Sequence, residues 1–415
     1  MHSLSWAYQT YLRHDRKEQN HWQDVCQAFR QYAIFAMTQW ANSQYRLHSL
    51  PETQRAHLPP ALRIDTPDFE ERSKLYKEAA IRNQFCLDCI LRHSGEQHSQ
   101  EAVSDGTYAS DEHISKVTSV LKSLARDWSI EGKAERDTTY PHILKLVEKY
   151  IPKTSEDGTR CRVCVPGAGV GRLACEIRAQ GYSVQGNEFS LFMLLASDFV
   201  LNGAVGSREN PLRISPYLLE SRNTHSFEDM CRTVSIPDMD PFEMVQSSHP
   251  GTDFSMAAGD FASIYSQDKM AWDGIVACFF LDTSPSIVEY LQVAYDMLKP
   301  GGVLIHFGPL LWHWSGPAMR PNDGAPDEYR RRFSHLDPNY LSSVDLSWED
   351  VRSVVVSIGF EIVEEMSGVE ALYTADPRSM MNTTYKCVSL VAKKPESPAE
   401  KDIGKSTPLE HRQSL

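Results

Sequence analysis

The sequence lacks any apolar run long enough to cross a membrane. Its longest runs, such as Ile275 to Leu281, are far shorter than the roughly 20 residues that a membrane helix requires. The first residues, MHSLSWAYQTYLRHDRKEQ, contain no apolar core of a secretory signal. We therefore expect a protein without a membrane partner that resides in the cytoplasm, with the nucleus as a second compartment.

Positive charge is also scarce. The 415 residues include 42 Lys and Arg against 55 Asp and Glu, which gives a formal net charge of −13. Binding of a nucleic-acid backbone requires a basic face, so this balance argues against a nucleic-acid partner. Hydrophobic residues make up 41% of the chain, which is enough to bury a large core and excludes extensive disorder.

The nine cysteines form no pattern that requires a metal or a disulfide. Two C-x-x-C pairs, Cys86/Cys89 and Cys161/Cys164, raise the question of zinc or redox chemistry. Cys161 and Cys164 lie in a predicted strand, where residues three apart face opposite sides of a sheet. Cys86 and Cys89 lie in a helical stretch without a second Cys/His pair nearby. We predict reduced thiols packed in the core and no metal site.

The first part of the chain is predicted to be helical. Apolar residues recur at three- and four-residue spacing from Trp22 to Trp40, which indicates one face of a long amphipathic helix. Further helices are predicted over residues 70–92 and 113–126. We interpret residues 1–115 as a helical region that supports the domain downstream.

Short β-branched runs alternate with helical patterns between Tyr140 and Pro309. Such alternation is typical of right-handed βαβ units on a parallel sheet. A later helix begins at Trp348, where Ser347 and Asp350 form a capping-box pattern. This order, with the last two strands antiparallel, indicates an α/β fold with the Rossmann-like seven-stranded sheet of a class I methyltransferase. The predicted strands cover residues 161–165, 182–188, 254–258, 273–281, 302–307, 360–364 and 385–392.

Two long insertions interrupt this predicted methyltransferase domain, which spans residues 116–395. Residues 204–252 are rich in Pro, Ser, Asn and Asp and separate the second strand from the third. Residues 315–345 follow the fifth strand. Insertions of this length usually carry function or form a lid. The last residues, 396–415, are polar without periodicity, and we predict a disordered tail.

A glycine-rich loop connects the first strand to the next helix. Gly167, Gly169 and Gly171 allow a sharp turn and let a cofactor approach the backbone closely. Glu188 ends the following strand, where a carboxylate can accept both hydroxyl hydrogens of an adenosine ribose. A dinucleotide fingerprint would need glycine at the position of Arg172, whereas the spacing G-x-G-x-G fits S-adenosylmethionine. We predict that this loop binds S-adenosylmethionine, with a purely structural turn as the alternative.

Two more segments lie where the rest of this donor is expected. Asp260 and Phe261 follow the third strand, where Asp can bond the adenine amino group and Phe can stack on the ring. Cys278 and Phe279 end the fourth strand. Ordinary core packing is the alternative for both phenylalanines.

Several longer motifs resemble the carnosine N-methyltransferase family, also called N2227-like proteins, over residues 15–395. The segments RDWSIEGKAERD and GNEFSLFML are much more specific than a glycine loop. The resemblance implies transfer of a methyl group from S-adenosylmethionine to the imidazole π nitrogen of histidine-containing dipeptides, which converts carnosine to anserine. The motifs lie at residues 126–137, 165–177, 181–194, 257–261, 278–283 and 298–314.

The resemblance also implies roles for individual residues. Ser123 stands where the family has a glutamine that contacts the donor, and serine can still form a hydrogen bond. Trp312 stands where the family usually has a tyrosine, and this change beside His313 could alter acceptor choice. Donor contacts carry over to Arg126, Gly167, Glu188, Asp260, Phe261 and Cys278, and acceptor contacts to Asp282, His313, Tyr385 and, less directly, Tyr373.

The chemistry favours a catalytic role for Asp282. For His313 the sequence alone favours packing, and only the resemblance implies a catalytic role. The methyl group of the sulfonium is already activated, so the enzyme must mainly align the nitrogen and exclude water. For the π nitrogen to attack, the imidazole proton must sit on the other nitrogen, where Asp282 can hold it. Asp282 as a helix cap and His313 packed between tryptophans are the structural alternatives.

Other functions stay open at this point. A protein or peptide histidine methyltransferase would use the same chemistry in a wider cleft, and a non-catalytic donor-binding scaffold would recruit partners through the N-terminal helices and the first insertion. The loop LDTSPS after the fourth strand lacks the Asn/Asp-Pro-Pro-aromatic motif of nucleic-acid amino-methyltransferases. The acceptor is expected to be a small molecule or peptide, and a homodimer is conceivable.

Overall fold

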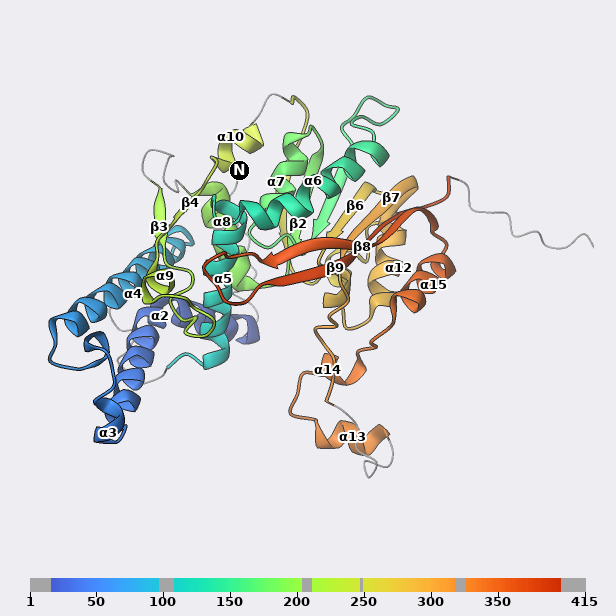
Figure 1. The fold of residues 1–415 in the computed structure, drawn as a ribbon. Helices are drawn as coiled ribbons and strands as arrows, with labels where there is room; N and C mark the ends of the chain where they lie inside the picture. Colours follow the sequence, from blue (N-terminus) through green and yellow to red (C-terminus); the bar gives the residue numbers. More distant parts are fainter. Residues whose placement is uncertain (1–15, 97–107, 204–210, 247–248, 318–325, 397–415) are drawn as a thin grey trace, which may run out of the picture.

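A seven-stranded β-sheet lies at the centre of the computed structural model, which describes residues 16–96, 108–203, 211–246, 249–317 and 326–396 (Figure 1). The spatial order of its strands is β5-β2-β1-β6-β7-β9-β8. The pairs β5/β2, β2/β1, β1/β6 and β6/β7 are parallel. The strands are β1 (Arg162–Pro166), β2 (Ser183–Glu188), β5 (Phe254–Ala258), β6 (Trp272–Cys278), β7 (Leu298–Gly308), β8 (Glu361–Thr374) and β9 (Thr383–Lys393).

This order is that of a class I methyltransferase, as the sequence predicts. The expectation for the last two strands needs one correction. They pair antiparallel with each other, but β9 alone runs against the other six, because β9 is antiparallel to both β7 and β8. The capping box at Ser347 and Asp350 is confirmed at the start of α15 (Trp348–Ile358).

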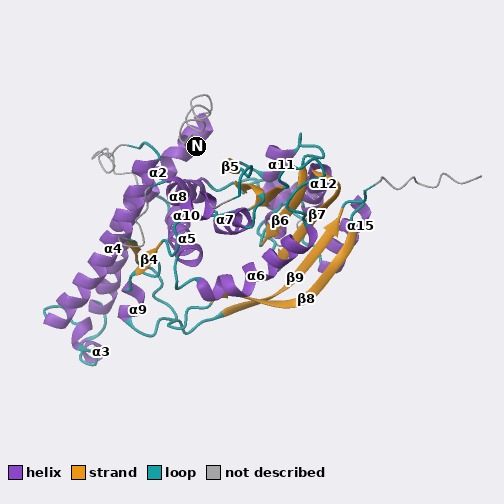
Figure 2. Ribbon diagram, turned by 90° about the horizontal axis from the view of Figure 1, so that it is seen from above, coloured by secondary structure: helices purple, strands orange, loops and turns teal. Residues whose placement is uncertain are grey.

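Helices cover both faces of the sheet (Figure 2). One face packs on α6 (Lys133–Tyr150) and α7 (Arg172–Ala179). The other packs on α11 (Phe261–Tyr265), α12 (Ile287–Met297) and α15. Side chains of β1 alternate between the two cores, so Cys161 and Cys164 lie on opposite faces as predicted. All nine cysteines are free, and within the described ranges no three His, Cys, Asp or Glu residues form a possible metal site.

The N-terminal helices share one hydrophobic core with the methyltransferase domain. Phe29 stacks on Phe192 of α8 (Leu191–Asn202), with ring centroids 5.8 Å apart. The side chains of Thr66 and Ser110 cap the two helices that follow them by accepting backbone N–H groups. The elements of this region are α2 (Arg16–His48), α3 (Glu52–Arg55), η1 (Pro60–Leu62), α4 (Pro67–His93) and α5 (Asp111–Trp128).

The insertion at residues 204–252 contains structure that the sequence analysis did not predict. Its strands β3 (Leu212–Ile214) and β4 (Val234–Ile236) form a separate antiparallel pair that joins the core of the N-terminal helices. Two short helices accompany them, α9 (Phe227–Cys231) and α10 (Pro241–Gln246).

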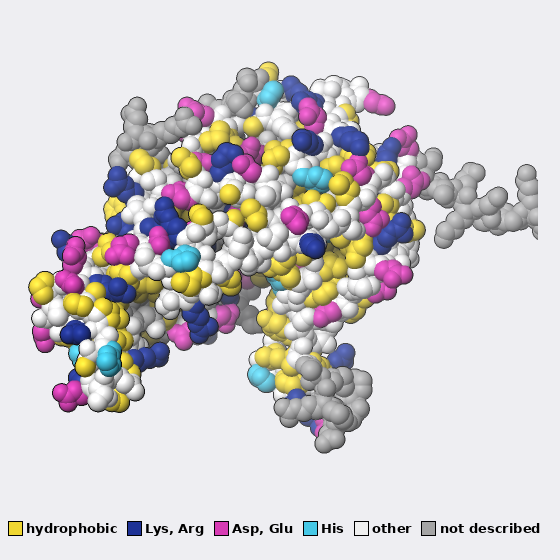
Figure 3. Space-filling view, viewed as in Figure 1, with side chains coloured by type: hydrophobic (Ala, Val, Ile, Leu, Met, Phe, Trp, Pro, Cys, Tyr) yellow, Lys and Arg dark blue, Asp and Glu magenta, His cyan; other side chains and the backbone are white. Residues whose placement is uncertain are grey.

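The insertion at residues 315–345 carries α13 (Pro326–Arg332) and α14 (Asn339–Ser342), which project downward from the body in Figure 1, to the right of the N-terminal helices. In the space-filling view, acidic and basic side chains are interspersed over the visible face (Figure 3). No described helix is long and apolar enough to span a membrane. The tail predicted over residues 396–415 lies outside the described residues except for its first residue.

The β8–β9 hairpin is much longer than the predicted strands. Its far end leaves the sheet and runs beside α6, where Thr138 Oγ1 accepts the Leu372 N–H at 3.0 Å and Glu135 Oε1 accepts the Ala375 N–H at 3.0 Å. The prediction stopped at residue 364. Residues 365–374 of β8 contain a glycine, Gly368, and only one buried side chain, Ala371, so this part of the sequence carries a weak core signal.

Candidate active site

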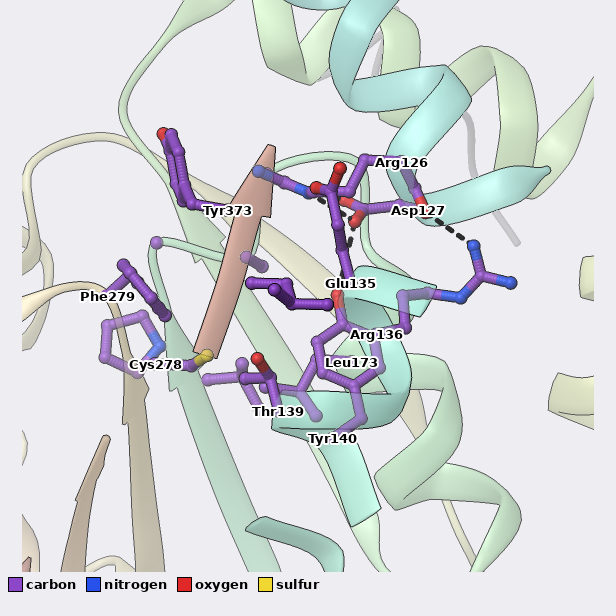
Figure 4. Close-up of a pocket in the computed structure, with 16 residues that line it drawn as sticks. Arg126, Asp127, Glu135, Arg136, Thr139, Tyr140, Leu173, Cys278, Phe279 and Tyr373 are labelled. Carbon is purple, nitrogen blue, oxygen red and sulfur yellow. Dashed lines mark hydrogen bonds and ion pairs between the residues drawn. The ribbon is translucent and has the colours of Figure 1, made fainter. Parts of the chain in front are cut away.

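A cavity of about 190 Å³ lies where the carboxyl ends of β1 and β6 meet the end of α5 and the start of α6 (Figure 4). Ligands of open α/β sheets bind at this edge. The far end of β8 forms another part of its wall through Leu372 and Tyr373. Of the residues singled out from the sequence, six line the cavity: Arg126, Gly167, Gly169, Cys278, Phe279 and Tyr373.

The glycine loop presents its backbone to this cavity. Gly167 has a φ of 65°, and a Cβ there would lie 2.8 Å from the ring of Phe280. Gly169 has a φ of 55°, and a Cβ there would meet nothing within 4 Å. The indole of Trp128 donates to the carbonyl of Val170 at 2.9 Å and so ties the loop to the end of α5. The loop is therefore fixed in shape and open on its cavity side.

Glu188 braces the same loop from the end of β2. One carboxylate oxygen accepts the Gly169 N–H at 2.9 Å, and the other accepts the Ser190 N–H at 2.8 Å. Burial raises the pKa of this carboxyl, while the backbone N–H groups lower it in part. Each carboxylate oxygen has a second lone pair, so these bonds leave acceptor capacity for a ribose.

Phe189 follows Glu188 and was missed in the sequence analysis. Its ring is 72% exposed, although it lies next to the carboxylate that the sequence assigns to the ribose. An exposed aromatic ring at this place can stack on an adenine base. Its signal in the sequence was its position directly after the carboxylate at the strand end.

Asp260 and Phe261 have clear structural roles. One oxygen of Asp260 caps α11 by accepting the Ser263 N–H at 2.9 Å, and the other accepts the Tyr290 hydroxyl at 2.9 Å. The ring of Phe261 is 3% exposed, with its centroid 5.4 Å from that of Phe280. The structure therefore favours the packing interpretation for Phe261, whereas Asp260 keeps free lone pairs.

Cys278 ends β6 at the cavity. Burial raises the pKa of its thiol to about 12, so the sulfur is a neutral contact and not a thiolate nucleophile. The predicted strand over residues 273–281 is too long, because Phe279 has a φ of 51° and turns the chain out of the sheet.

Arg126 reaches the cavity as part of a charged pair. Its Nε and Nη2 donate to the two oxygens of Asp127 at 2.8 and 3.0 Å, and Tyr140 donates to the same carboxylate at 3.3 Å. Asp127 raises the pKa of the guanidinium further above its ordinary value. Ser123 lies about one turn earlier on α5 and does not line the cavity.

A buried ionic network holds this end of α5 in place. Asp238, from the first insertion, pairs with Arg136 and Arg172, each at 2.7 Å. Arg136 also donates to the carbonyl groups of Arg126 and Ser129. Arg172 donates to the carbonyl of Asp127 at 3.1 Å. The first insertion therefore helps to fix the Arg126–Asp127 pair, a role that was not predicted.

Asp282 lies in the short helix η2 (Leu281–Thr283) and is 2% exposed. Its carboxylate accepts the Leu311 N–H at 2.7 Å, and its backbone carbonyl accepts the His313 N–H at 3.1 Å. Burial raises the pKa of Asp282, whereas the Leu311 N–H and the nearby His313 oppose part of this shift. The carboxylate thus holds the segment after β7, and it does not cap α12.

His313 is exposed on the turn that Asp282 holds. The neighbouring Trp312 has a φ of 47° and donates from its indole to the carbonyl of Leu346 at 3.1 Å. Trp314 donates to the carbonyl of Thr283 at 2.9 Å. Both tryptophans are therefore anchored, and His313 is not packed between them.

Three aromatic rings connect the cavity with Asp282. Phe279 stacks on Tyr373 with centroids 5.7 Å apart, and Tyr385 lies 5.3 Å from Tyr373 and 5.9 Å from Phe279. Burial, Tyr373 and the charge of Asp282 all raise the pKa of the Tyr385 hydroxyl. Asp282, His313 and Tyr385 do not line the cavity itself. Asp282 and His313 therefore lie outside the cavity, whereas Tyr373 and Tyr385 belong to the aromatic wall itself.

Known proteins resemble this chain over most of its length. The mouse protein named carnosine N-methyltransferase is 37% identical over 383 residues, which cover 92% of this chain and 88% of the mouse protein. The protein of that name from Schizosaccharomyces pombe is 37% identical over 274 residues, covering 66% of this chain and 69% of its own.

Solved structures give a more distant match. Phosphoethanolamine N-methyltransferase 2 from Haemonchus contortus, in complex with S-adenosyl-L-methionine, is 14% identical with a TM-score of 0.36, covering 72% of this chain and 60% of its own. The fold assignment rests on the strand order instead. The sequence model described as carnosine N-methyltransferase matches residues 104–396. The chain belongs to the carnosine N-methyltransferase family.

Proposed function

We propose that this protein transfers the methyl group of S-adenosylmethionine to the π nitrogen of the imidazole in a histidine-containing dipeptide such as carnosine. The family assignment supports the reaction and the substrate class. The position of the donor is supported by the cavity beside the glycine loop, together with the brace between Glu188 and Gly169.

The donor supplies an activated methyl group when it is bound. In the displacement, the lone pair of the imidazole nitrogen attacks the methyl carbon, the carbon–sulfur bond breaks, and its electron pair remains on sulfur. The products are S-adenosylhomocysteine and a methylimidazolium. Free imidazole is largely neutral at pH 7, so no strong base is needed to generate the nucleophile.

The buried carboxylate of Asp282 is the observation that supports methylation at the π nitrogen and not at the τ nitrogen. A carboxylate that holds the N–H of the τ nitrogen leaves the lone pair of the π nitrogen free for attack. One lone-pair region of Asp282 is used by the Leu311 N–H, and the others are available to an acceptor. Since burial raises the pKa of Asp282, its carboxylate is a strong hydrogen-bond acceptor and offsets the positive charge that develops on the ring.

His313 and Tyr385 have complementary tasks in this proposal. The turn that carries His313 is bound to Asp282 through the backbone, so the two residues are held close to each other. Tyr385 lies in the wall between the cavity and Asp282 and offers a hydroxyl on an apolar ring. Together they align the acceptor and exclude water, which is most of what this displacement requires.

The test is methyl transfer to carnosine, followed by NMR of the imidazole protons, which distinguishes the π product from the τ product. We expect methylation at the π nitrogen. Exclusive τ methylation would overturn the role of Asp282. Turnover of a histidine-containing peptide or protein without turnover of carnosine would favour a protein or peptide histidine methyltransferase with a wider cleft. Binding of the donor without turnover of any imidazole would favour a non-catalytic donor-binding scaffold.

A further inference from the structure

Glu135 is a charged residue of the cavity that the proposed mechanism does not use. It lies in the first turn of α6, is partly buried and lines the cavity. Figure 4 shows its carboxylate beside the Arg126 guanidinium and the Asp127 carboxylate. One oxygen accepts the Ala375 N–H at 3.0 Å.

The other charged groups that line the cavity are already paired. Arg126 forms a two-bond pair with Asp127, and Arg136 pairs with Asp238. Within the part of the chain that the structure describes, Glu135 has no ion-pair partner. A carboxylate that is partly removed from water without an ion pair of its own is unfavourable. Burial raises the pKa of Glu135, and the Ala375 N–H and the charge of Arg126, which is itself paired with Asp127, oppose only part of this shift. A cationic group of a ligand would remove this cost.

We propose that Glu135 binds the α-ammonium group at the amino-acid end of the methyl donor. This rests on S-adenosylmethionine as the donor. Arg126 lies next to Glu135, and its Nη1 has no partner among the described residues, so the two side chains present one positive and one negative group side by side. An α-amino acid carries its ammonium and carboxylate groups on the same carbon atom, which matches this arrangement.

The acceptor is the other source of an ammonium group. In carnosine, however, the ammonium and the carboxylate lie at opposite ends of the dipeptide, so one adjacent pair of charges fits it less well. The predicted acceptor residues Asp282 and His313 also lie beyond the aromatic wall and not in this cavity. The position of Glu135 and the spacing of the ligand charges therefore both favour the donor, and not the acceptor, as the source of the ammonium group.

The test uses S-adenosylhomocysteine and its analogue with hydrogen in place of the α-amino group, titrated calorimetrically into the full-length protein without acceptor. The wild type should bind S-adenosylhomocysteine at least about tenfold more tightly than the analogue, as expected for a hydrogen bond to a charged group. Glu135→Gln should lose this preference by weakening S-adenosylhomocysteine binding alone. Its amide oxygen can still accept the Ala375 N–H, so the fold should survive.

Glu131→Gln is the matched control, because it removes the same charge from an exposed residue four positions earlier that does not line the cavity. It should leave both affinities unchanged. Equal binding of the two ligands by the wild type would overturn the proposal, and this result does not depend on any variant. Equal losses for both ligands in Glu135→Gln would show a structural role instead.

Steady-state kinetics with carnosine distinguish the two possible sources of the ammonium group. A raised KM for carnosine in Glu135→Gln, with unchanged affinity for S-adenosylhomocysteine, would assign the residue to the acceptor and overturn its assignment to the donor. Because the binding experiment contains no acceptor, a failure of carnosine methylation would contradict the proposed function without affecting this inference.

Discussion

His306 provides a measurable link between burial and stability. It lies in β7, is 0% exposed and stacks on Trp348 with ring centroids 5.7 Å apart. Neither ring nitrogen has a hydrogen-bond partner among the described residues. Burial disfavours the charged imidazole and lowers its pKa to about 4, while the backbone of Ala277 opposes only part of this shift.

The direction of the pH effect follows from the two pKa values. Above the unfolded-state pKa of 6.5, both states hold a neutral ring and His306 adds no pH dependence. As the pH falls from 6.5 toward 4, the unfolded state takes up the proton first, so the free energy of unfolding decreases. The full loss corresponds to about 3 kcal/mol, of which about 2 kcal/mol is expressed at pH 5.

The substitution His306→Leu removes this titration and keeps a similar side-chain volume. Denaturant unfolding of wild type and variant between pH 7.5 and 5 should show the wild type losing about 2 kcal/mol more than the variant. His57→Leu, at an exposed position, is the control and should follow the wild type. Asp282 and Glu135 have raised pKa values and act in the opposite direction, but they are present in both proteins and cancel in the difference. A difference that is independent of pH would refute the reasoning.

Three further predictions concern the site and its support. Glu188→Ala should weaken donor binding by about 1.5 to 3 kcal/mol for each charged hydrogen bond lost, and unchanged affinity in a folded variant by calorimetry would contradict this. Asp282→Asn should lower kcat strongly with little change in donor affinity. The amide oxygen can still accept the Leu311 N–H, but the neutral side chain no longer offsets the positive charge that develops on the imidazole. A change confined to KM would instead indicate that Asp282 stabilises the ground state and the transition state equally. Deletion of residues 1–115 should expose the shared core and give aggregated or inactive protein, whereas a monodisperse, active truncation by size-exclusion chromatography would exclude this role.

The central sheet could be predicted because local sequence and burial agree there. The strands β1 and β6 are largely apolar, buried runs, and the glycine loop follows the first of them. The two strands of the first insertion were missed because they are three residues long and pack on distant helices. The local sequence pattern of such a short strand does not indicate which distant helix it will contact.

The candidate site was predictable residue by residue, but its pairings were not. The sequence singles out Arg126, and the structure shows that Asp127 and Tyr140 hold it. Asp238 is 102 residues from its partner Arg136, so only the folded chain brings them together. The cellular location and a homodimer stay predictions, since a single chain carries no record of either.

The segments added to the common methyltransferase sheet meet at one place. The N-terminal helices end in α5, whose last turn carries Arg126 and Asp127. The first insertion fixes that turn through Asp238, and the β8–β9 hairpin reaches it through Glu135. The hairpin is also tied to the first insertion, because Arg232 pairs with Asp376 at 2.5 Å.

Donor binding and acceptor selection should therefore be coupled in this protein. Tyr373 and Tyr385 belong to the same hairpin that closes the donor cavity, and Tyr385 lies near Asp282. A change in the hairpin's contacts would shift the donor cavity and the acceptor wall together. We therefore expect the N-terminal helices, the first insertion and the β8–β9 hairpin, rather than the glycine loop, to determine which imidazole acceptor this methyl-donor site serves.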